Sequence, residues 1–144
     1  MNKLLHFLPF FLVLAFIVCD KNGSTGPDLK CSDPEDGALI RVNYPGEGDT
    51  FKVGDEIDIR YSIDVEQTPG AVAFISKNNG RTWDKIVEGE MIPNEKTEGY
   101  ECIVYSWTIP SDFVTESNSK IKVKVSKYGD PTEKSVSDAF TINP

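Results

Sequence analysis

Histidine is almost absent from this chain of 144 residues, because His6 is the only one and it lies in the apolar N-terminal segment. Without further histidines, the rest of the chain can form neither a histidine-based catalytic triad nor a zinc site built from imidazoles. We therefore predict no catalytic residues, no metal site and no cofactor. The protein is expected not to be an enzyme.

Acidic side chains are the remaining candidates for chemistry. Glu88 and Glu90 form a carboxylate pair of the kind that glycosidases use, although solvated loop acids are the simpler interpretation. Residues 33–37 and 47–49 offer loop oxygens for calcium, but neither stretch has the spacing of a known calcium loop. These acids do not change the prediction.

Basic residues are few: 15 Lys and Arg stand against 23 Asp and Glu, for a net charge of -8. Nucleic acids require clustered positive charge, so we expect no nucleic-acid partner. In the only local basic run, residues 120–127, lysines alternate with isoleucine and valine as in a half-exposed strand. We interpret it as a solvated face that also discourages edge pairing. Attraction to anionic lipid or wall polymer is the alternative.

Long apolar runs are missing after residue 18. The run Leu4–Val18 is fifteen residues long and contains Pro9, whereas a membrane-spanning helix needs about 20 apolar residues. Lys3 is the only charged residue before it, and the first acid is Asp20. This arrangement predicts a removable export signal.

The end of that run, Ala15–Cys19, resembles a bacterial lipoprotein signal, although Phe16 and Val18 differ from the residues usual in this family. The resemblance implies cleavage before Cys19 and lipidation of its thiol, with residues 1–18 as the signal peptide. An uncleaved anchor and cleavage further downstream are the alternatives.

Polar and glycine-containing residues follow the signal, and we expect residues 19–37 to be a flexible tether. The expected location is the bacterial cell envelope, lipid-anchored to a membrane and facing the periplasm or exterior. The membrane is then a partner through the N-terminal lipid.

Only three cysteines are present. If Cys19 carries lipid, Cys31 and Cys102 remain, and such a pair normally forms a disulfide outside the cytoplasm. The loop that it closes spans roughly 70 residues, for which a chain-entropy argument gives a stabilisation of about 4 kcal/mol. Two separate thiols are the alternative, and the lack of a Cys-x-x-Cys motif argues against redox catalysis.

Short stretches of alternating apolar and polar residues, separated by Gly, Pro and Asn turns, fill residues 38–144. In the last of them, Val136, Phe140 and Ile142 are expected to face inward together. The pattern predicts an all-β fold, a single immunoglobulin-like β-sandwich domain of seven or eight strands. The expected strands cover residues 38–44, 56–65, 71–76, 82–87, 101–109, 120–127 and 135–142.

Several motifs follow the order found in bacterial immunoglobulin-like or fibronectin-like envelope modules. The chain resembles this family over most of residues 38–144. The resemblance implies an extracytoplasmic adhesion, spacer or binding module and transfers no catalytic residue. The motifs are Ile40–Pro45, Phe51–Tyr61, Phe74–Ser76 with Gly80–Trp83, Tyr105–Pro110 and Ser137–Ile142.

Residues 76–83 also resemble an Asp-box, the hairpin repeated in sialidase propellers, with Asn78 where the acid normally lies. In that family the box is a turn closed by side-chain hydrogen bonds and a tryptophan, and a propeller needs several blades. We therefore interpret Trp83 as a residue that defines the fold.

Two functions are compatible with these features. The first is a noncatalytic membrane-anchored envelope lipoprotein acting as a protein-binding, adhesion or spacer module. The alternative is a carbohydrate-binding module of the cell envelope that recognises polysaccharide, with Trp83 and Tyr128 as candidate sugar-binding residues and Tyr44 and Tyr100 as further aromatics near strand ends. Exposed aromatics in one plane would favour sugar, and scattered ones would favour a protein partner.

Overall fold

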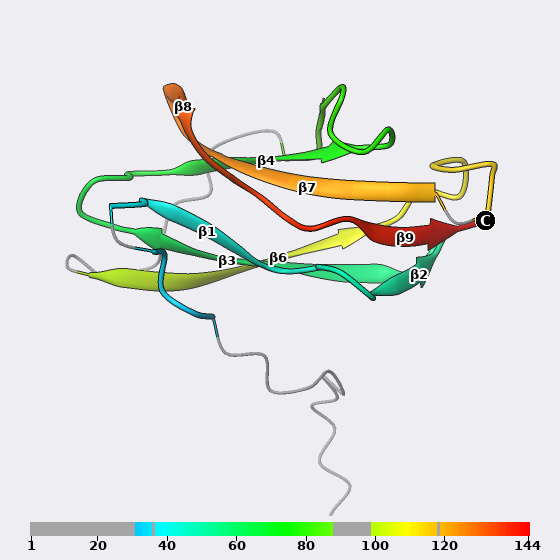
Figure 1. The fold of residues 1–144 in the computed structure, drawn as a ribbon, viewed down its shortest axis with the longest axis horizontal. Coiled ribbons are helices and arrows are strands. Elements are labelled where there is room, and N and C mark those ends of the chain that lie inside the picture. The colour runs from blue at the N-terminus through cyan, green and yellow to red at the C-terminus, as the bar shows by residue number, and fades with distance from the viewer. Residues whose placement is uncertain (1–30, 36, 88–98, 118) are drawn as a thin grey trace, which may run out of the picture.

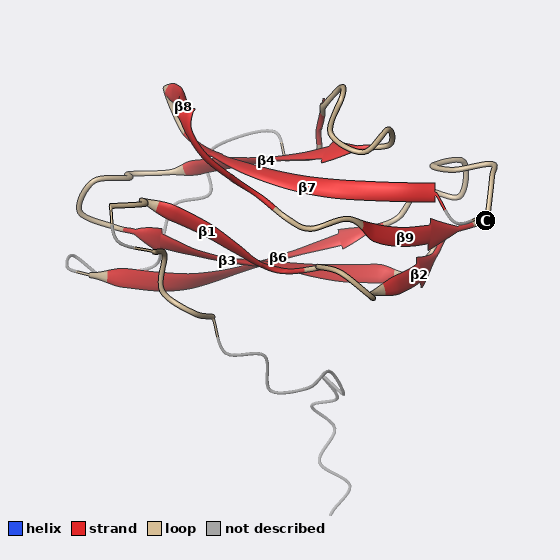
Figure 2. Cartoon of the chain, in the orientation of Figure 1, coloured by secondary structure: helices blue, strands red, loops and turns tan. Residues whose placement is uncertain are grey.

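The computed structural model describes residues 31–35, 37–87, 99–117 and 119–144, which form two β-sheets in two layers (Figures 1 and 2). This part of the chain contains strands and no helix. The predicted all-β, two-sheet fold is confirmed. The signal segment, Cys19 and the residues up to 30 lie outside the described residues.

The smaller sheet has the order β1-β3-β6, and the larger sheet has the order β2-β9-β7-β4-β5, with β8 also paired to β7. All pairs are antiparallel except β2 with β9, which is parallel. The strands are β1 (Ile40–Tyr44), β2 (Thr50–Lys52), β3 (Glu56–Asp64), β4 (Ala71–Ser76), β5 (Asp84–Lys85), β6 (Tyr100–Thr108), β7 (Ser119–Lys127), β8 (Asp130–Val136) and β9 (Phe140–Asn143).

The alternation of β3 explains how the smaller sheet meets the core. Ile57, Ile59 and Tyr61 are buried, whereas Asp58 and Arg60 lie on the outer face, because successive side chains in a strand point to opposite sides. β3 pairs with β6 without interruption from Glu56↔Thr108 to Asp64↔Tyr100. Its buried side chains pack against the inner face of the larger sheet.

That inner face comes mainly from β4, β7 and β9. Ile75 of β4, Val123 and Val125 of β7, and Phe140 and Ile142 of β9 are all buried in one cluster. Each fully buried aliphatic or aromatic side chain contributes on the order of 1.5–3 kcal/mol. The core is therefore shared by segments that are far apart in sequence.

The structure has nine strands rather than seven or eight. Thr50–Lys52 forms an additional short strand, and only Asp84–Lys85 of the expected strand 82–87 is extended and paired. The expected strand 135–142 is divided into β8 and β9, which pair with the same side of β7 at different heights. The prediction of one continuous last strand was therefore wrong.

Ser137 explains this division. Its backbone N–H donates to the carbonyl of Val123 at 2.9 Å, while its Oγ accepts the N–H of Val123 at 3.0 Å. Because Ser137 takes a buried position here, the alternation breaks, and Val136 is 41 % exposed rather than inward with Phe140 and Ile142.

The position of β7 corrects a second expectation. Ile121, Val123 and Val125 are fully buried, so the half-exposed alternation is confirmed. However, β7 pairs with β4 on one side and with β8 and β9 on the other. Its lysines therefore do not protect a sheet edge.

Candidate functional site

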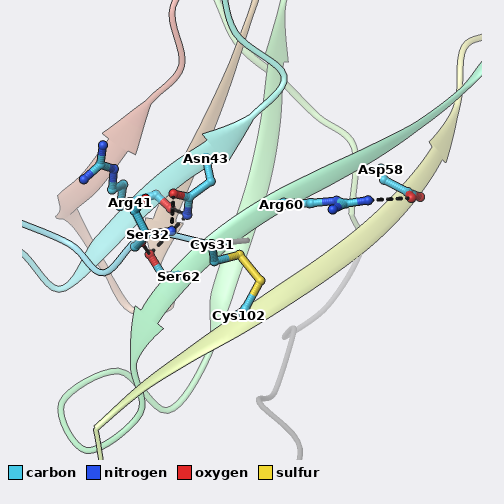
Figure 3. The surroundings of a disulfide bond; sticks show 8 residues. All are labelled: Cys31, Ser32, Arg41, Asn43, Asp58, Arg60, Ser62 and Cys102. Carbon is cyan, nitrogen blue, oxygen red and sulfur yellow. Dashed lines mark hydrogen bonds and ion pairs between the residues drawn. A yellow bond between two sulfur atoms is a disulfide. The ribbon is translucent and has the colours of Figure 1, made fainter. Parts of the chain in front are cut away.

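Cys31 and Cys102 form a disulfide, which confirms the predicted pairing (Figure 3). Their Cα atoms are 5.6 Å apart, and 71 positions separate them in sequence. Cys102 lies on the outer face of β6, opposite to the side chains that pack on the core, while Cys31 precedes the first strand. The bridge therefore ties the incoming chain to the smaller sheet and does not join the two sheets.

The residues that follow Cys31 also contact this sheet. Ser32 donates its N–H to Oδ1 of Asn43 at 3.0 Å, and its carbonyl accepts the hydroxyl of Ser62 at 2.6 Å (Figure 3). Ser62 is buried. A guanidinium N–H of Arg41 donates to the carbonyl of Asp33 at 3.2 Å. These bonds fix residues 31–33, which the sequence assigned to the tether.

The hairpin that resembles an Asp-box is closed by two side chains. Oδ1 of Asn78 accepts the N–H groups of Arg81 and Thr82 at 3.1 and 2.8 Å, and Nδ2 of Asn78 donates to the hydroxyl of Thr82 at 2.8 Å. Oγ of Ser76 accepts the N–H of Gly80 at 2.8 Å. Gly80 has a φ of +91°, a conformation that glycine adopts without strain. Asn78 therefore satisfies the backbone N–H groups of the turn as a neutral side chain, without the charge of an aspartate.

Trp83 follows this turn and is partly covered. The Lys124 ammonium lies 4.7 Å from the centre of the Trp83 ring and 4.3 Å from the centre of the Phe74 ring. Such contacts hold a cation against the ring faces. Trp83 is thus part of a side-chain cluster on the outer face of the larger sheet. Its ring is not a fully exposed surface on which a sugar could stack.

The second sugar-binding candidate, Tyr128, lies elsewhere. It is 50 % exposed in the turn between β7 and β8. Lys124, which touches Trp83, lies four residues before it, roughly 13 Å along a strand. The structure therefore does not bring the two candidate rings together.

The other two aromatics are also separate. Tyr44 is half-buried and makes an edge contact with Phe51 at 6.2 Å between ring centres, and burial, with the nearby carboxylate of Asp49, raises its pKa. Tyr100 begins β6 and is half-buried. Tyr44 and Tyr100 belong to the smaller sheet, whereas Trp83 and Tyr128 lie in turns that follow strands of the larger sheet. Scattered aromatics are the arrangement that we expected to favour a protein partner over sugar.

A polar recess that the sequence did not indicate lies between the edges of the two sheets. It has a volume of about 280 Å³ and is lined by β1 and by the segment that joins β8 to β9. Next to it, the N–H of Val42 in β1 donates to Oγ of Ser135 in β8 at 3.0 Å. Its lining includes Arg41 and Asn43 from one part of the chain and Asp138 from another, almost 100 positions later in sequence. No local sequence pattern could therefore have revealed the recess.

The outer face of the smaller sheet carries one ion pair that the sequence also did not reveal. Arg60 lies 3.7 Å from Asp58 (Figure 3). The other carboxylate oxygen of Asp58 accepts the hydroxyl of Ser106 at 2.6 Å. The side chain of Arg60 is 17 % exposed and that of Asp58 is 33 % exposed. The cluster links β3 to β6.

The candidate calcium loops are used for local structure where they are described. Asp49 accepts the N–H of Gly46 at 2.8 Å through its carboxylate and the N–H of Thr141 through its carbonyl. Within the described ranges, no three His, Cys, Asp or Glu residues come together as a metal site. The carboxylate pair Glu88 and Glu90 lies outside those ranges, as does His6.

No protein-family model matches this chain, and comparisons with curated proteins and with solved structures found no significant match. The part of the chain that the structure describes contains no apolar helix of membrane-spanning length.

Proposed function

We propose that this protein is a noncatalytic envelope lipoprotein, in which lipid on Cys19 anchors an immunoglobulin-like sandwich that acts as a protein-binding, adhesion or spacer module. The membrane is its partner through the lipid, and the folded domain faces the periplasm or exterior. Nucleic acid and cofactors have no part in this function.

The disulfide is the observation that carries this proposal. A pair of cysteines that forms a disulfide is typical of extracytoplasmic proteins. Cys31 is twelve residues after Cys19, a distance that a flexible chain spans with a mean of about 20 Å. A chain anchored at Cys19 would therefore reach a covalent attachment point on the smaller sheet, which supports a tethered module.

The strand arrangement supports the immunoglobulin-like assignment. In that fold, strands A, B and E lie in one sheet and C, F and G in the other. Here β1, β3 and β6 lie in one sheet, and β4, β7 and β9 lie in the other. The chain order of these six strands is the same as the order A, B, C, E, F and G.

Intact mass spectrometry of the purified full chain tests the anchor. The expected mass corresponds to cleavage before Cys19 plus covalent lipid, with a gain of two hydrogens on reduction of the disulfide. Cys19→Ser is expected to move the protein from the membrane fraction to the soluble fraction. An unmodified chain, or one cleaved downstream of Cys19, would contradict lipidation.

Chemical crosslinking on intact envelopes tests the protein-binding role. A reproducible partner is expected in affinity capture of the crosslinked protein, and repeated capture without one would count against this role and leave the spacer role. Carbohydrate binding through Trp83 and Tyr128 makes a different prediction: sedimentation with wall polysaccharides should fall in Trp83→Ala and Tyr128→Ala. The separation of these rings gives that alternative no support.

A further inference from the structure

The larger sheet collects five lysines on its outer face. The strand registers place Lys124 of β7 beside Phe74 of β4, and Phe74 beside Lys85 of β5. Ser126, two residues after Lys124, lies beside Lys134 of β8. Since residues two apart share a face, these lysines point to the same side. The lysine face consists of Lys85, Lys120, Lys122, Lys124 and Lys134.

No outward position that the structure describes in the paired strands of this face holds a carboxylate, although Glu47 and Asp138 line a recess beside Lys120. The other outward positions of this sheet are Val72, Phe74, Ser76, Ser126, Val136, Thr141 and Asn143, together with Thr50 and Lys52 of the edge strand β2. The only ion pair among the described residues joins Arg60 to Asp58 on the smaller sheet. Burial lowers the pKa of Lys124, and the positive charge of Lys134 lowers it further. A positive surface is thus concentrated on a protein whose net charge is -8.

The structure removes the simplest explanation for the three lysines of β7, whereas Lys85 and Lys134 lie on edge strands. Charged side chains often protect exposed sheet edges, but β7 is paired on both sides. The Lys124 ammonium lies over the rings of Phe74 and Trp83. These rings hold the ammonium in place but do not neutralise its charge. Lys120 donates to the hydroxyl of Thr141 at 3.3 Å, and no lysine of this face forms an ion pair with another described residue.

The orientation of the lysine face argues against the anchoring membrane as its partner. The disulfide attaches the N-terminal segment to Cys102 on the outer face of the smaller sheet. The two sheets pack through their inner faces, so their outer faces point in opposite directions (Figure 1). A membrane near Cys31 would thus lie on the side away from the lysines.

The chemistry of the face favours a charged polymer. Lys120, Lys122 and Lys124 repeat at about 6.6 Å along β7, and lysine acts as a flexible point charge rather than a fixed fork. Lysine is also depleted in protein–protein interfaces, whose centres are apolar. We propose that the lysine face binds a linear anionic polysaccharide, a carboxylated chain whose repeated charges meet the lysine row. This inference rests on the proposed noncatalytic function as an adhesion module, and it names the class of molecule to which that module binds.

Binding of the full chain in detergent micelles to polygalacturonate tests this proposal. The test variant, Lys122→Gln with Lys134→Gln, leaves Lys124 and its aromatic contacts intact. The matched control, Lys77→Gln with Lys127→Gln, removes the same charge from positions outside the lysine face, since Lys127 lies beside the inward Ala71. The expected result is at least a tenfold loss of affinity in the test variant and less than a twofold loss in the control. Binding should also weaken steeply with salt, since exposed charges are screened within about 3 Å at 1 M.

Several outcomes would overturn the proposal. These are no binding to polygalacturonate, an equal loss in both variants, or equal affinity for neutral dextran. Tighter binding to polyglutamate through the same lysines would assign the face to an acidic protein, and tighter binding to phosphatidylglycerol vesicles would assign it to lipid. The lipid on Cys19 is measured separately by mass, so either result can fail alone. Shortening of the polygalacturonate chain would contradict the noncatalytic role while leaving binding intact.

Discussion

Two tyrosines show how the surroundings of a single hydroxyl decide its contribution. Tyr61 is fully buried, and its hydroxyl has no hydrogen-bond partner among the described residues. Tyr105 instead donates its hydroxyl to the carbonyl of Ile86 at 3.2 Å. A buried polar group without a partner costs about 1–3 kcal/mol, whereas a typical hydrogen bond contributes about 1 kcal/mol.

Replacement of these tyrosines by phenylalanine should therefore have opposite effects. Tyr61→Phe is expected to raise the free energy of unfolding by about 1 kcal/mol, and Tyr105→Phe is expected to lower it by about 1 kcal/mol. Urea unfolding followed by fluorescence measures both. A loss of stability in Tyr61→Phe would mean that its hydroxyl has a partner in solution.

Burial also raises the pKa of Tyr61 well above its ordinary value. The raised pKa means that the folded state holds this proton more tightly than the unfolded state. The stabilisation that comes from this raised pKa is fully present below the pKa of about 10 that tyrosine has in the unfolded state, and it is lost as the pH rises above that value. Unfolding measured from pH 8 to 11 should show a steeper alkaline loss in the wild type than in Tyr61→Phe. Equal slopes would refute this assignment.

Asn78 provides a further prediction that concerns one side chain. Asn78→Ala removes the acceptor of two backbone N–H groups and should lower the free energy of unfolding by about 1–2 kcal/mol. Asn78→Asp keeps that acceptor, and Thr82 can donate its hydroxyl to the carboxylate. It should stay within about 0.5 kcal/mol of the wild type. Thermal unfolding compares the two, and an equally large loss in Asn78→Asp would show that the amide donor is required.

At the scale of the elements, Ser137 determines where β8 ends and β9 begins. Ser137→Ala would leave the N–H of Val123 buried without its acceptor, so we expect a loss of about 1–3 kcal/mol. Ser111→Ala, at an exposed position, is the control and should change stability by less than about 0.5 kcal/mol. Hydrogen exchange at Val123 should increase in Ser137→Ala alone. Unchanged exchange would mean that another group replaces the hydroxyl.

At the scale of the whole molecule, the disulfide closes a loop of 71 positions. Cys31→Ser with Cys102→Ser should lower the free energy of unfolding by up to about 4 kcal/mol, since the open chain gains conformational freedom in the unfolded state. Urea unfolding of the double variant, compared with the reduced wild type, measures this. A large difference between those two would show that the serines, rather than the missing cross-link, cause the loss.

The predicted strands were most accurate where the alternation was regular. The expected strand 56–65 became β3 (Glu56–Asp64), because a run of inward isoleucines allows only one register against the core. The last strand was predicted wrongly, since the side-chain contact of Ser137 with Val123 overrides the local pattern. The local periodicity of a sequence cannot reveal a hydrogen bond between residues of different strands.

The candidate site was predictable to a smaller extent. The Cys31–Cys102 pairing followed from the cysteine count, and the turn at Asn78 followed from its motif. The recess beside Arg41 and the pair Arg60–Asp58 did not, because the first requires the positions of two sheet edges and the second requires side-chain geometry.

Sequence patterns alone predicted the all-β fold, the inward faces of the long strands and, with Cys19 assigned to lipid, the pairing of Cys31 with Cys102. Periodicity and residue counts are local or compositional properties, so they can be read without coordinates. The three-dimensional arrangement was needed to show that β7 is an interior strand, that Trp83 and Tyr128 lie apart, and that lysines from three strands share one surface. Those relations depend on which strands become neighbours, and that order is set by packing of the whole core.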